Sequence, residues 1–292
     1  MRPAFFAAVA AACLICGAGA AAPPADLPAA IYADPAPDAA HPARMVVLHI
    51  PSGGVSINGV AYLASGAGPH GTVVLCHGLP GNEKNLDLAQ AIRRAGWNAV
   101  TFNYRGSWGS PGSFRFAQNP QDADAVLAYL ADPANAKALG VDPRKLVIVG
   151  HSMGGWVAVI TAAHHPELAG LATFSAADMS TIGAAPQAVR VKVMEENMEA
   201  LAGITAESMA ADAAEAAEGR SFAKAAAGLV KTPYLAMTSD DGLARDTDAL
   251  VEAIRAAGGT KVAAAHVAAD HSWSDHRIAL EAIVINWLAS LT

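Results

Sequence analysis

The chain has 292 residues, of which 53% are hydrophobic and only 15% are charged. This length indicates one large domain or one domain with an insertion, and the composition excludes a disordered chain. The formal net charge is −7 and no basic run of five or more residues occurs. Partners such as nucleic acid or an anionic membrane surface are therefore not expected.

The first twenty residues have the pattern of a signal peptide. Arg2 supplies a positive charge, residues 5–16 are apolar but too few to span a bilayer, and Ala18-Gly19-Ala20 fits a cleavage site. We predict a signal peptide over 1–20 and a protein that is periplasmic or secreted, with no stable membrane insertion after cleavage. A retained membrane anchor, or a lipid attached at Cys13 or Cys16, is the alternative.

Cleavage would leave Cys76 as the one cysteine, so the mature chain could form no internal disulfide. Cys76 ends an apolar run, where we expect it to be a small buried hydrophobic side chain. A role as a nucleophile is the alternative. Residues 21–44 are rich in Ala, Pro and Asp and are predicted to be a mobile linker that leads into a domain over 45–292.

From residue 45 onward, apolar runs of strand length alternate with segments of helical periodicity. Residues 45–51 and 55–64 flank Gly53-Gly54 and predict an antiparallel hairpin. Further strands are expected at 72–76, 99–104, 145–149, 171–174, 234–238 and 261–266, and helices at 85–95, 122–130, 153–164, 247–257 and 277–288. This succession predicts an α/β fold with a mainly parallel, doubly wound sheet and a site at the carboxyl ends of its strands.

Residues 176–230 interrupt the alternation and contain no convincing strand. About 55 residues are too many for one crossover loop, so we predict a helical cap inserted over the sheet. Val191, Met194, Met198 and Leu201 have the spacing of an apolar stripe on one helix, and 206–217 is predicted to be a second helix. We expect the stripe to pack the cap onto the sheet, with direct contact to a substrate as the alternative.

The segment Gly150-His151-Ser152-Met153-Gly154 matches G-x-S-x-G. It directly follows the predicted strand 145–149 and opens a helix, which is the context that this motif requires. Such a turn presents Ser152 Oγ above the strand ends and directs the backbone N–H of Met153 toward the reacting oxygen. A glycine-rich turn with a passive serine is the alternative.

With this turn in place, the chain resembles the α/β-hydrolase superfamily over roughly residues 45–290. The resemblance also rests on Cys76-His77-Gly78-Leu79-Pro80-Gly81 and on the segment from Asn103 to Ser110, NYRGSWGS. Within the superfamily, the chain is most similar to the small secreted esterases and to the dienelactone-hydrolase and serine-peptidase-like branches. The resemblance implies acyl transfer to water by a serine, a histidine and an acid.

The order of these residues in the superfamily implies an acid after a late strand and a histidine after the last strand. Asp241 has the small apolar Ala244 three residues later, as family members often do, and Asp240 is the alternative. His271 has the position of the base, and His276 is its competitor, expected at the start of the last helix.

By resemblance, the backbone N–H of Leu79 joins that of Met153 in an oxyanion hole. His77 and His151 are expected to hold the loops around the site, and Trp108 to line or cover the cleft. His164-His165 ends a helix, where a cationic histidine suits the helix dipole. No histidine pair has metal-like spacing with carboxylates in the sequence, so we predict neither a metal nor another cofactor.

The predicted function is a serine hydrolase that cleaves carboxylic esters through an acyl-enzyme. Its expected partner is a small-molecule ester or a short peptide, and the sequence leaves the oligomeric state open. One alternative is a peptidase or amidase of the same fold, in which Glu195-Glu196 could bind a peptide amino group. The other is a ligand carrier without catalysis.

Overall fold

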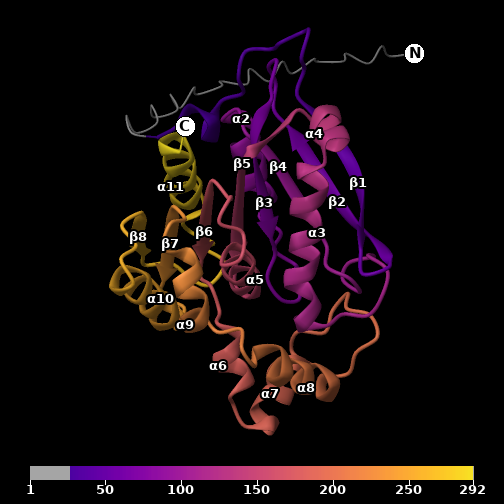
Figure 1. Cartoon of the computed structure of the whole chain (residues 1–292), viewed down its shortest axis with the longest axis vertical. Helices are drawn as coiled ribbons and strands as arrows, with labels where there is room; N and C mark the ends of the chain where they lie inside the picture. Colours follow the sequence, from indigo (N-terminus) through magenta and orange to yellow (C-terminus); the bar gives the residue numbers. More distant parts are fainter. Residues whose placement is uncertain (1–26, 292) are drawn as a thin grey trace, which may run out of the picture.

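The computed structural model describes residues 27–291, so the predicted signal peptide at 1–20 lies outside the described residues. An eight-stranded sheet forms the centre of the molecule (Figure 1). Its strands lie in the order β1-β2-β4-β3-β5-β6-β7-β8. They are β1 (Arg44–Ser52), β2 (Val55–Leu63), β3 (His70–Cys76), β4 (Asn98–Phe102), β5 (Val141–His151), β6 (Gly170–Phe174), β7 (Tyr234–Ser239) and β8 (Val262–Val267).

The sheet is parallel from β4 to β8 and antiparallel at the other edge. β2 pairs antiparallel with both β1 and β4, and all the remaining neighbours are parallel. The carboxyl ends of β3 to β8 therefore meet at one edge of the sheet, where functional loops gather in folds of this kind. This topology confirms the predicted α/β class and the mainly parallel sheet.

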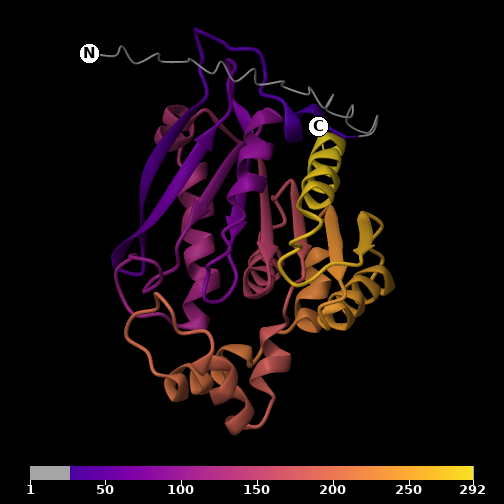
Figure 2. The same ribbon diagram turned by 180° about the vertical axis from the view of Figure 1, so that it is seen from behind.

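Helices cover both faces of the sheet because alternate strand residues point to opposite sides. One face packs against α3 (Asn119–Ala131), α5 (Met153–Ala162) and α10 (Ala244–Ala256). The other packs against α2 (Leu86–Arg94) and α11 (Arg277–Ser290), which lie in front in Figure 2. Within β5, Ile148 belongs to the first of these cores, whereas Val147 and Val149 belong to the second.

Three short helical elements outside the cap were not predicted from the sequence. They are α1 (Ala29–Tyr32), α4 (Pro133–Leu139) and the 3-10 turn η1 (Phe116–Gln118). The 3-10 turn η2 (Ala226–Leu229) falls within the segment predicted as a helical cap. α1 falls within the segment expected to be a linker, and there the Arg94 side chain donates a hydrogen bond to the Ala30 carbonyl at 2.5 Å. α4 begins where the Asp132 carboxylate accepts the N–H groups of Ala134 and Asn135, which is a standard N-cap.

The segment between β6 and β7 is helical, as the sequence predicts. α6 (Met179–Gly183), α7 (Gln187–Glu195) and α8 (Ala206–Ala217) form a cap at the lower end of the molecule in Figure 1. α9 (Phe222–Ala225) and η2 then return to the main body, where α9 packs against α5 and α10.

The apolar stripe in this cap does not lie on one helix, so that prediction was wrong. α7 ends at Glu195, and Met198 and Leu201 lie in the loop beyond it. The Asn197 side chain donates to the Val193 carbonyl and so replaces the hydrogen bond that another helical turn would have made. Met194 is fully buried, and Met198 and Leu201 pack against the same core, which favours a packing role.

Within residues 27–291, we find no helix with the length and apolarity needed to cross a membrane.

Candidate active site

Ser152 stands between the end of β5 and the start of α5, in a backbone conformation that non-glycine residues rarely adopt. Its φ is 56° and its ψ is −126°. The neighbouring backbone is packed closely enough to demand glycine. A Cβ added at Gly150 would lie 2.1 Å from the Gly154 carbonyl oxygen, and one at Gly154 would lie 2.1 Å from that of Cys76. These contacts force the sharp turn that exposes the serine hydroxyl at the strand ends.

The loop that follows β3 lies directly against this serine. A Cβ added at Gly78 would be 2.9 Å from Ser152 Cβ and 3.4 Å from its Oγ. Neither Leu79 N–H nor Met153 N–H donates a hydrogen bond to any other residue that the structure describes. Two backbone donors are therefore unpaired beside the hydroxyl, at the positions named for an oxyanion hole.

Two side chains hold the shape of this loop from behind. His77 Nδ1 donates to the Gly78 carbonyl and Trp108 Nε1 donates to the Pro80 carbonyl, each at 2.8 Å. Burial lowers the pKa of His77 to about 4, so its ring is neutral near pH 7. Trp108, expected to line or cover the cleft, is not among the residues that line the pocket beside Ser152; its indole bonds to the Pro80 carbonyl of the pocket wall, and Lys84 Nζ lies 4.5 Å from its ring.

His271 lies in the loop between β8 and α11, and its ring is paired with a buried carboxylate. His271 Nδ1 donates to Asp241 Oδ2 at 2.8 Å, and the Asp241 side chain is only 2% exposed. Asp241 Oδ1 accepts the Leu243 N–H at 3.0 Å. Burial alone would raise the pKa of Asp241, but hydrogen bonds from His271, Leu243 N–H and the Ser175 hydroxyl outweigh it and lower that pKa.

The alternative acid, Asp240, and the alternative base, His276, lie outside this pair. The Asp240 side chain is 66% exposed, and its Oδ1 is 3.1 Å from His266 Nε2 on β8. His276 occupies the N-cap position of α11, at the start of the last helix. The structure thus brings Asp241 to His271 and leaves Asp240 and His276 outside that pair.

His151 is a positioning residue whose partner the sequence did not reveal. Its Nε2 donates to the backbone carbonyl of His271 at 2.8 Å, and its ring stacks on Phe174 with 4.8 Å between centroids. Burial lowers the pKa of His151 to about 4, so near pH 7 it acts as a neutral donor. The expected role of holding a loop fits this contact, which fixes the backbone that carries the His271 ring.

Ser152 and His271 line the same small pocket, of about 160 Å³. The loop after β3, residues 78–83, supplies most of its remaining wall. Among the described residues, no hydrogen bond joins Ser152 Oγ to the His271 ring. Such bonds are often long before a substrate binds and shorten in the complex.

The cap touches this site from one side. The Asn82 side chain, in the pocket wall, donates to Glu199 Oε2 at 3.3 Å. The backbone N–H of Trp108 donates to the Ala200 carbonyl. Glu195 and Glu196, considered as an anchor for a peptide amino group, are exposed and do not line the pocket.

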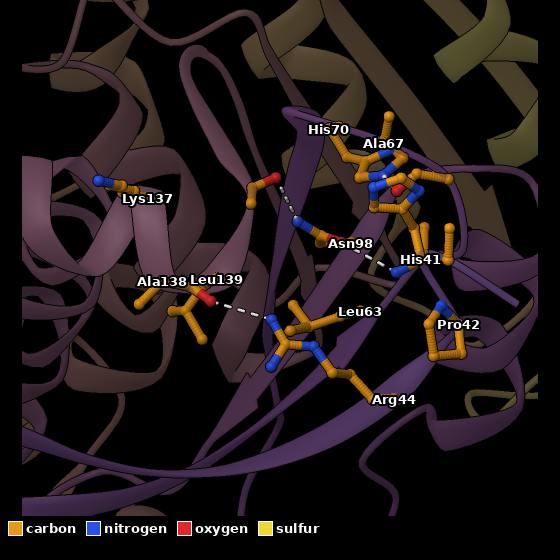
Figure 3. A pocket seen from close by; sticks show the side chains of 15 residues that line it. His41, Pro42, Arg44, Leu63, Ala67, His70, Asn98, Lys137, Ala138 and Leu139 are labelled. Atoms are coloured by element: carbon orange, nitrogen blue, oxygen red, sulfur yellow. Dashed lines mark hydrogen bonds between the residues drawn. The ribbon is translucent and has the colours of Figure 1, made fainter.

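A larger pocket, of about 350 Å³, lies at the opposite end of the sheet (Figure 3). It is formed where β3, β4 and β5 begin, with His70, Asn98 and Gly140 in its wall. Arg44 crosses it and donates to the Ala138 carbonyl at 2.9 Å. None of Ser152, Asp241 and His271 lines this larger pocket, so it is separate from the candidate active site.

A cluster of possible metal ligands lies apart from both pockets. Asp124, His164 and His165 each offer a ligand atom, and these atoms lie within 4.8 Å of one another. No local sequence pattern marks this group, because Asp124 lies on α3, 40 residues before His164 in the turn after α5.

Comparison with known proteins agrees with the topology. Residues 73–287 match the family described as the alpha/beta hydrolase family. Two uncharacterized proteins of Mycobacterium tuberculosis, from strains CDC 1551 / Oshkosh and ATCC 25618 / H37Rv, are each 31% identical over 109 residues. That match spans 37% of this chain and only 36% of either relative.

Several solved structures share the fold. A thermostable carboxyl esterase from Bacillus coagulans has a TM-score of 0.65 at 15% identity, over 85% of this chain and 98% of that one. A 2,6-dihydroxy-pseudo-oxynicotine hydrolase has a TM-score of 0.65 at 17% identity, over 86% and 68%. An esterase from Pyrobaculum calidifontis has a TM-score of 0.64 at 19% identity, over 86% and 87%. Since the family match covers most of the chain, this protein belongs to the alpha/beta hydrolase family.

Proposed function

We propose that this protein is a serine hydrolase that cleaves carboxylic esters through an acyl-enzyme, with Ser152, His271 and Asp241 as its triad. The observation that carries the proposal is the 2.8 Å hydrogen bond between His271 Nδ1 and the buried Asp241 carboxylate, at a pocket that Ser152 also lines. The fold similarity to esterases supports the reaction class by analogy alone.

The chemistry follows from how each group is bonded. Because His271 Nδ1–H is held by Asp241, the lone pair of the neutral ring is on Nε2, which takes the proton from Ser152 Oγ as the serine attacks the ester carbonyl. His271 then gives this proton to the leaving alcohol. Water then gives a proton to His271 as it attacks the acyl-serine, the acyl–Oγ bond breaks to release the carboxylic acid, and His271 returns the proton to Ser152 Oγ. Asp241 keeps the ring oriented and stabilises its cation at both steps.

The negative charge that develops on the carbonyl oxygen is placed beside the unpaired N–H groups of Leu79 and Met153. Met153 is the first residue of α5, so the positive end of the helix dipole adds to this field. One such donor contributes about 3 kcal/mol at the transition state.

The size of the pocket supports a small acyl or alcohol group. Its volume of about 160 Å³ is small for a ligand site, and its wall at Leu79 and Pro80 is apolar. A peptidase of the same fold is the second candidate, but the exposed positions of Glu195 and Glu196 give it no anchor beside Ser152.

A fluorophosphonate probe tests the nucleophile. We expect one probe per chain at Ser152 in the folded protein, and no labelling of Ser152→Ala. Cys76 is an internal control, because burial raises the pKa of its thiol to about 12 and keeps it unreactive. Absence of labelling in folded wild-type protein would favour the carrier and reject both enzyme hypotheses.

A substrate panel then separates esterase from peptidase. We expect p-nitrophenyl esters of short acids to be hydrolysed with a higher kcat/KM than aminoacyl p-nitroanilides. Faster turnover of the anilides would reverse the preference while leaving the triad intact.

We further propose that the protein is exported, with residues 1–20 removed as a signal peptide. The apolar stretch of 5–16 and the small residues at Ala18 and Ala20 support this proposal. Mass spectrometry of the protein from a secreting cell should give a chain that begins at Ala21. A chain that retains residues 1–20 would instead indicate an uncleaved anchor.

A further inference from the structure

The turn that follows α5, at the end of this helix opposite Ser152, carries two histidines that face a carboxylate on α3. The two helices pack side by side on one face of the sheet (Figure 1). His164 Nε2 is 3.0 Å from Asp124 Oδ1, and His165 Nε2 is 3.2 Å from the same oxygen atom. Three potential ligand atoms, one from α3 and two from the turn after α5, therefore lie close together.

The other nitrogen of each imidazole is already bonded to an acceptor. His164 Nδ1 is 2.9 Å from the Ile160 carbonyl oxygen, and His165 Nδ1 is 2.5 Å from Glu167 Oε1. A carbonyl and a carboxylate have no hydrogen to give, so each Nδ1 carries the proton. Each Nε2 in turn lies at hydrogen-bond distance from Asp124 Oδ1, so both rings bond to this one carboxylate oxygen.

A metal ion could replace the two hydrogen bonds to Asp124, because the three ligand atoms already lie within 4.8 Å of one another. With metal–ligand bonds of about 2.0–2.1 Å, neighbouring ligand atoms are about 3.3 Å apart in a tetrahedral site and about 2.9 Å apart in an octahedral one. The two nitrogen–oxygen separations, 3.0 and 3.2 Å, fall in this range.

The contacts behind the ligands are also those of metal sites. Histidine ligands commonly donate their second N–H to a carboxylate or a backbone carbonyl, which fixes the tautomer and the ring orientation. Glu167 and the Ile160 carbonyl make these two contacts here. A site with two imidazoles and one carboxylate suits Zn²⁺ and similar transition metals, and is poor in oxygen for Ca²⁺ or Mg²⁺.

We propose that Asp124, His164 and His165 bind a divalent transition metal of the Zn²⁺ type, with water in the remaining position or positions. The metal would tie the end of α5 to α3. α5 spans Met153–Ala162, which places this site roughly 15 Å from the serine turn along the helix, so the metal stabilises the fold and takes no part in the reaction.

Zinc titration of the full, tag-free protein after chelator treatment tests the site. Isothermal titration should give one equivalent of Zn²⁺ that is lost, or weakened at least tenfold, in Asp124→Asn and in the double variant His164→Gln/His165→Gln. Glu167→Gln removes only the support behind His165 and should weaken Zn²⁺ about 10- to 100-fold. Mg²⁺ and Ca²⁺ should not compete.

His266→Gln is the matched control. His266 also lies 3.1 Å from an exposed aspartate, Asp240, but no second histidine faces that carboxylate. Its zinc affinity should equal that of the wild type. Because the ligand side chains lie near the surface, with His164 51% exposed, the variants should stay folded, and circular dichroism checks this.

Thermal unfolding provides a second readout. Zn²⁺ at 100 times its Kd should raise the Tm of the wild type by about 5 °C and leave the double variant unchanged. Zinc uptake by the double variant equal to that of the wild type, or no uptake by the wild type at 100 µM Zn²⁺, would overturn the proposal.

Discussion

Two adjacent aspartates in the turn after β7 differ in their surroundings, and this difference supports Asp241 as the proposed triad acid. Asp241 is 2% exposed and bonded to His271, whereas Asp240 is 66% exposed and lies beside His266. We expect Asp241→Asn to lower kcat by about 10³- to 10⁴-fold, because the amide no longer selects the imidazole tautomer that accepts the serine proton. Steady-state kinetics on a p-nitrophenyl ester measures the effect.

Asp240→Asn is the control, since it makes the same chemical change one residue away. Its kcat should stay within about twofold of the wild type. A large loss for Asp240→Asn together with a small one for Asp241→Asn would move the triad acid to Asp240.

For single residues, the motif and the order along the chain predicted the candidate serine and histidine. They did not predict which side chains these residues contact in the folded protein. Ser152 and His271 follow from the turn motif and from position along the chain. Asp240 and Asp241 occupy one turn, so only the direction of each side chain separates them. The bond from His151 Nε2 to the His271 carbonyl joins residues 120 apart and leaves no local signal.

Among the structural elements, the loop after β3 depends on the absence of a side chain at Gly78. An added Cβ would lie 2.9 Å from Ser152 Cβ, which cannot rotate away because it is fixed to a strained backbone. We expect Gly78→Ala to push the loop and the serine apart and to lower kcat/KM by about 10²-fold. Ester hydrolysis by the purified variant measures this loss.

Leu79→Ala is the matched control in the same loop. It removes side-chain atoms but keeps the backbone N–H, so kcat should change only a fewfold. If Gly78→Ala is as active as Leu79→Ala, the loop is not in contact with the serine during catalysis.

The positions of helices and strands were predicted well where the apolar periodicity is strong. They were predicted less well where a single polar contact determines the residue at which an element ends. All eight strands were expected: the central ones are buried apolar runs, and β1 and β2 flank a glycine turn with alternating burial. α7 ends early because the Asn197 amide takes the Val193 carbonyl, which a pattern of apolar residues cannot register. The Asp124 cluster depends on how α3 packs against α5, and the sequence gives that packing no direct signal.

For the whole molecule, alternation of strands and helices predicted the layers, but not the strand order. That order places β3 beside β5, so the loop after β3 and the serine turn leave the sheet from neighbouring strands. The same pairing explains why His77 and His151 are both buried, one on each of these strand ends.

These two histidines couple the stability of the molecule to pH. Burial lowers the pKa of each from 6.5 to about 4. Between these values the unfolded chain binds protons that the folded protein does not, so the free energy of unfolding falls as the pH drops from 6.5 toward 4. The loss reaches roughly 3 kcal/mol per histidine, and above pH 6.5 neither contributes.

Urea unfolding at pH 7 and pH 4.5 measures this loss in the wild type, in His77→Gln, in His151→Gln and in the double variant. Carboxyl groups also titrate at low pH, so the difference between wild type and variant at each pH isolates the histidines. Each single variant should lose less stability than the wild type over this range, and the double variant least of all. An equal pH dependence in all four proteins would mean that both rings accept a proton while folded, and that neither is held as a neutral donor beside Ser152.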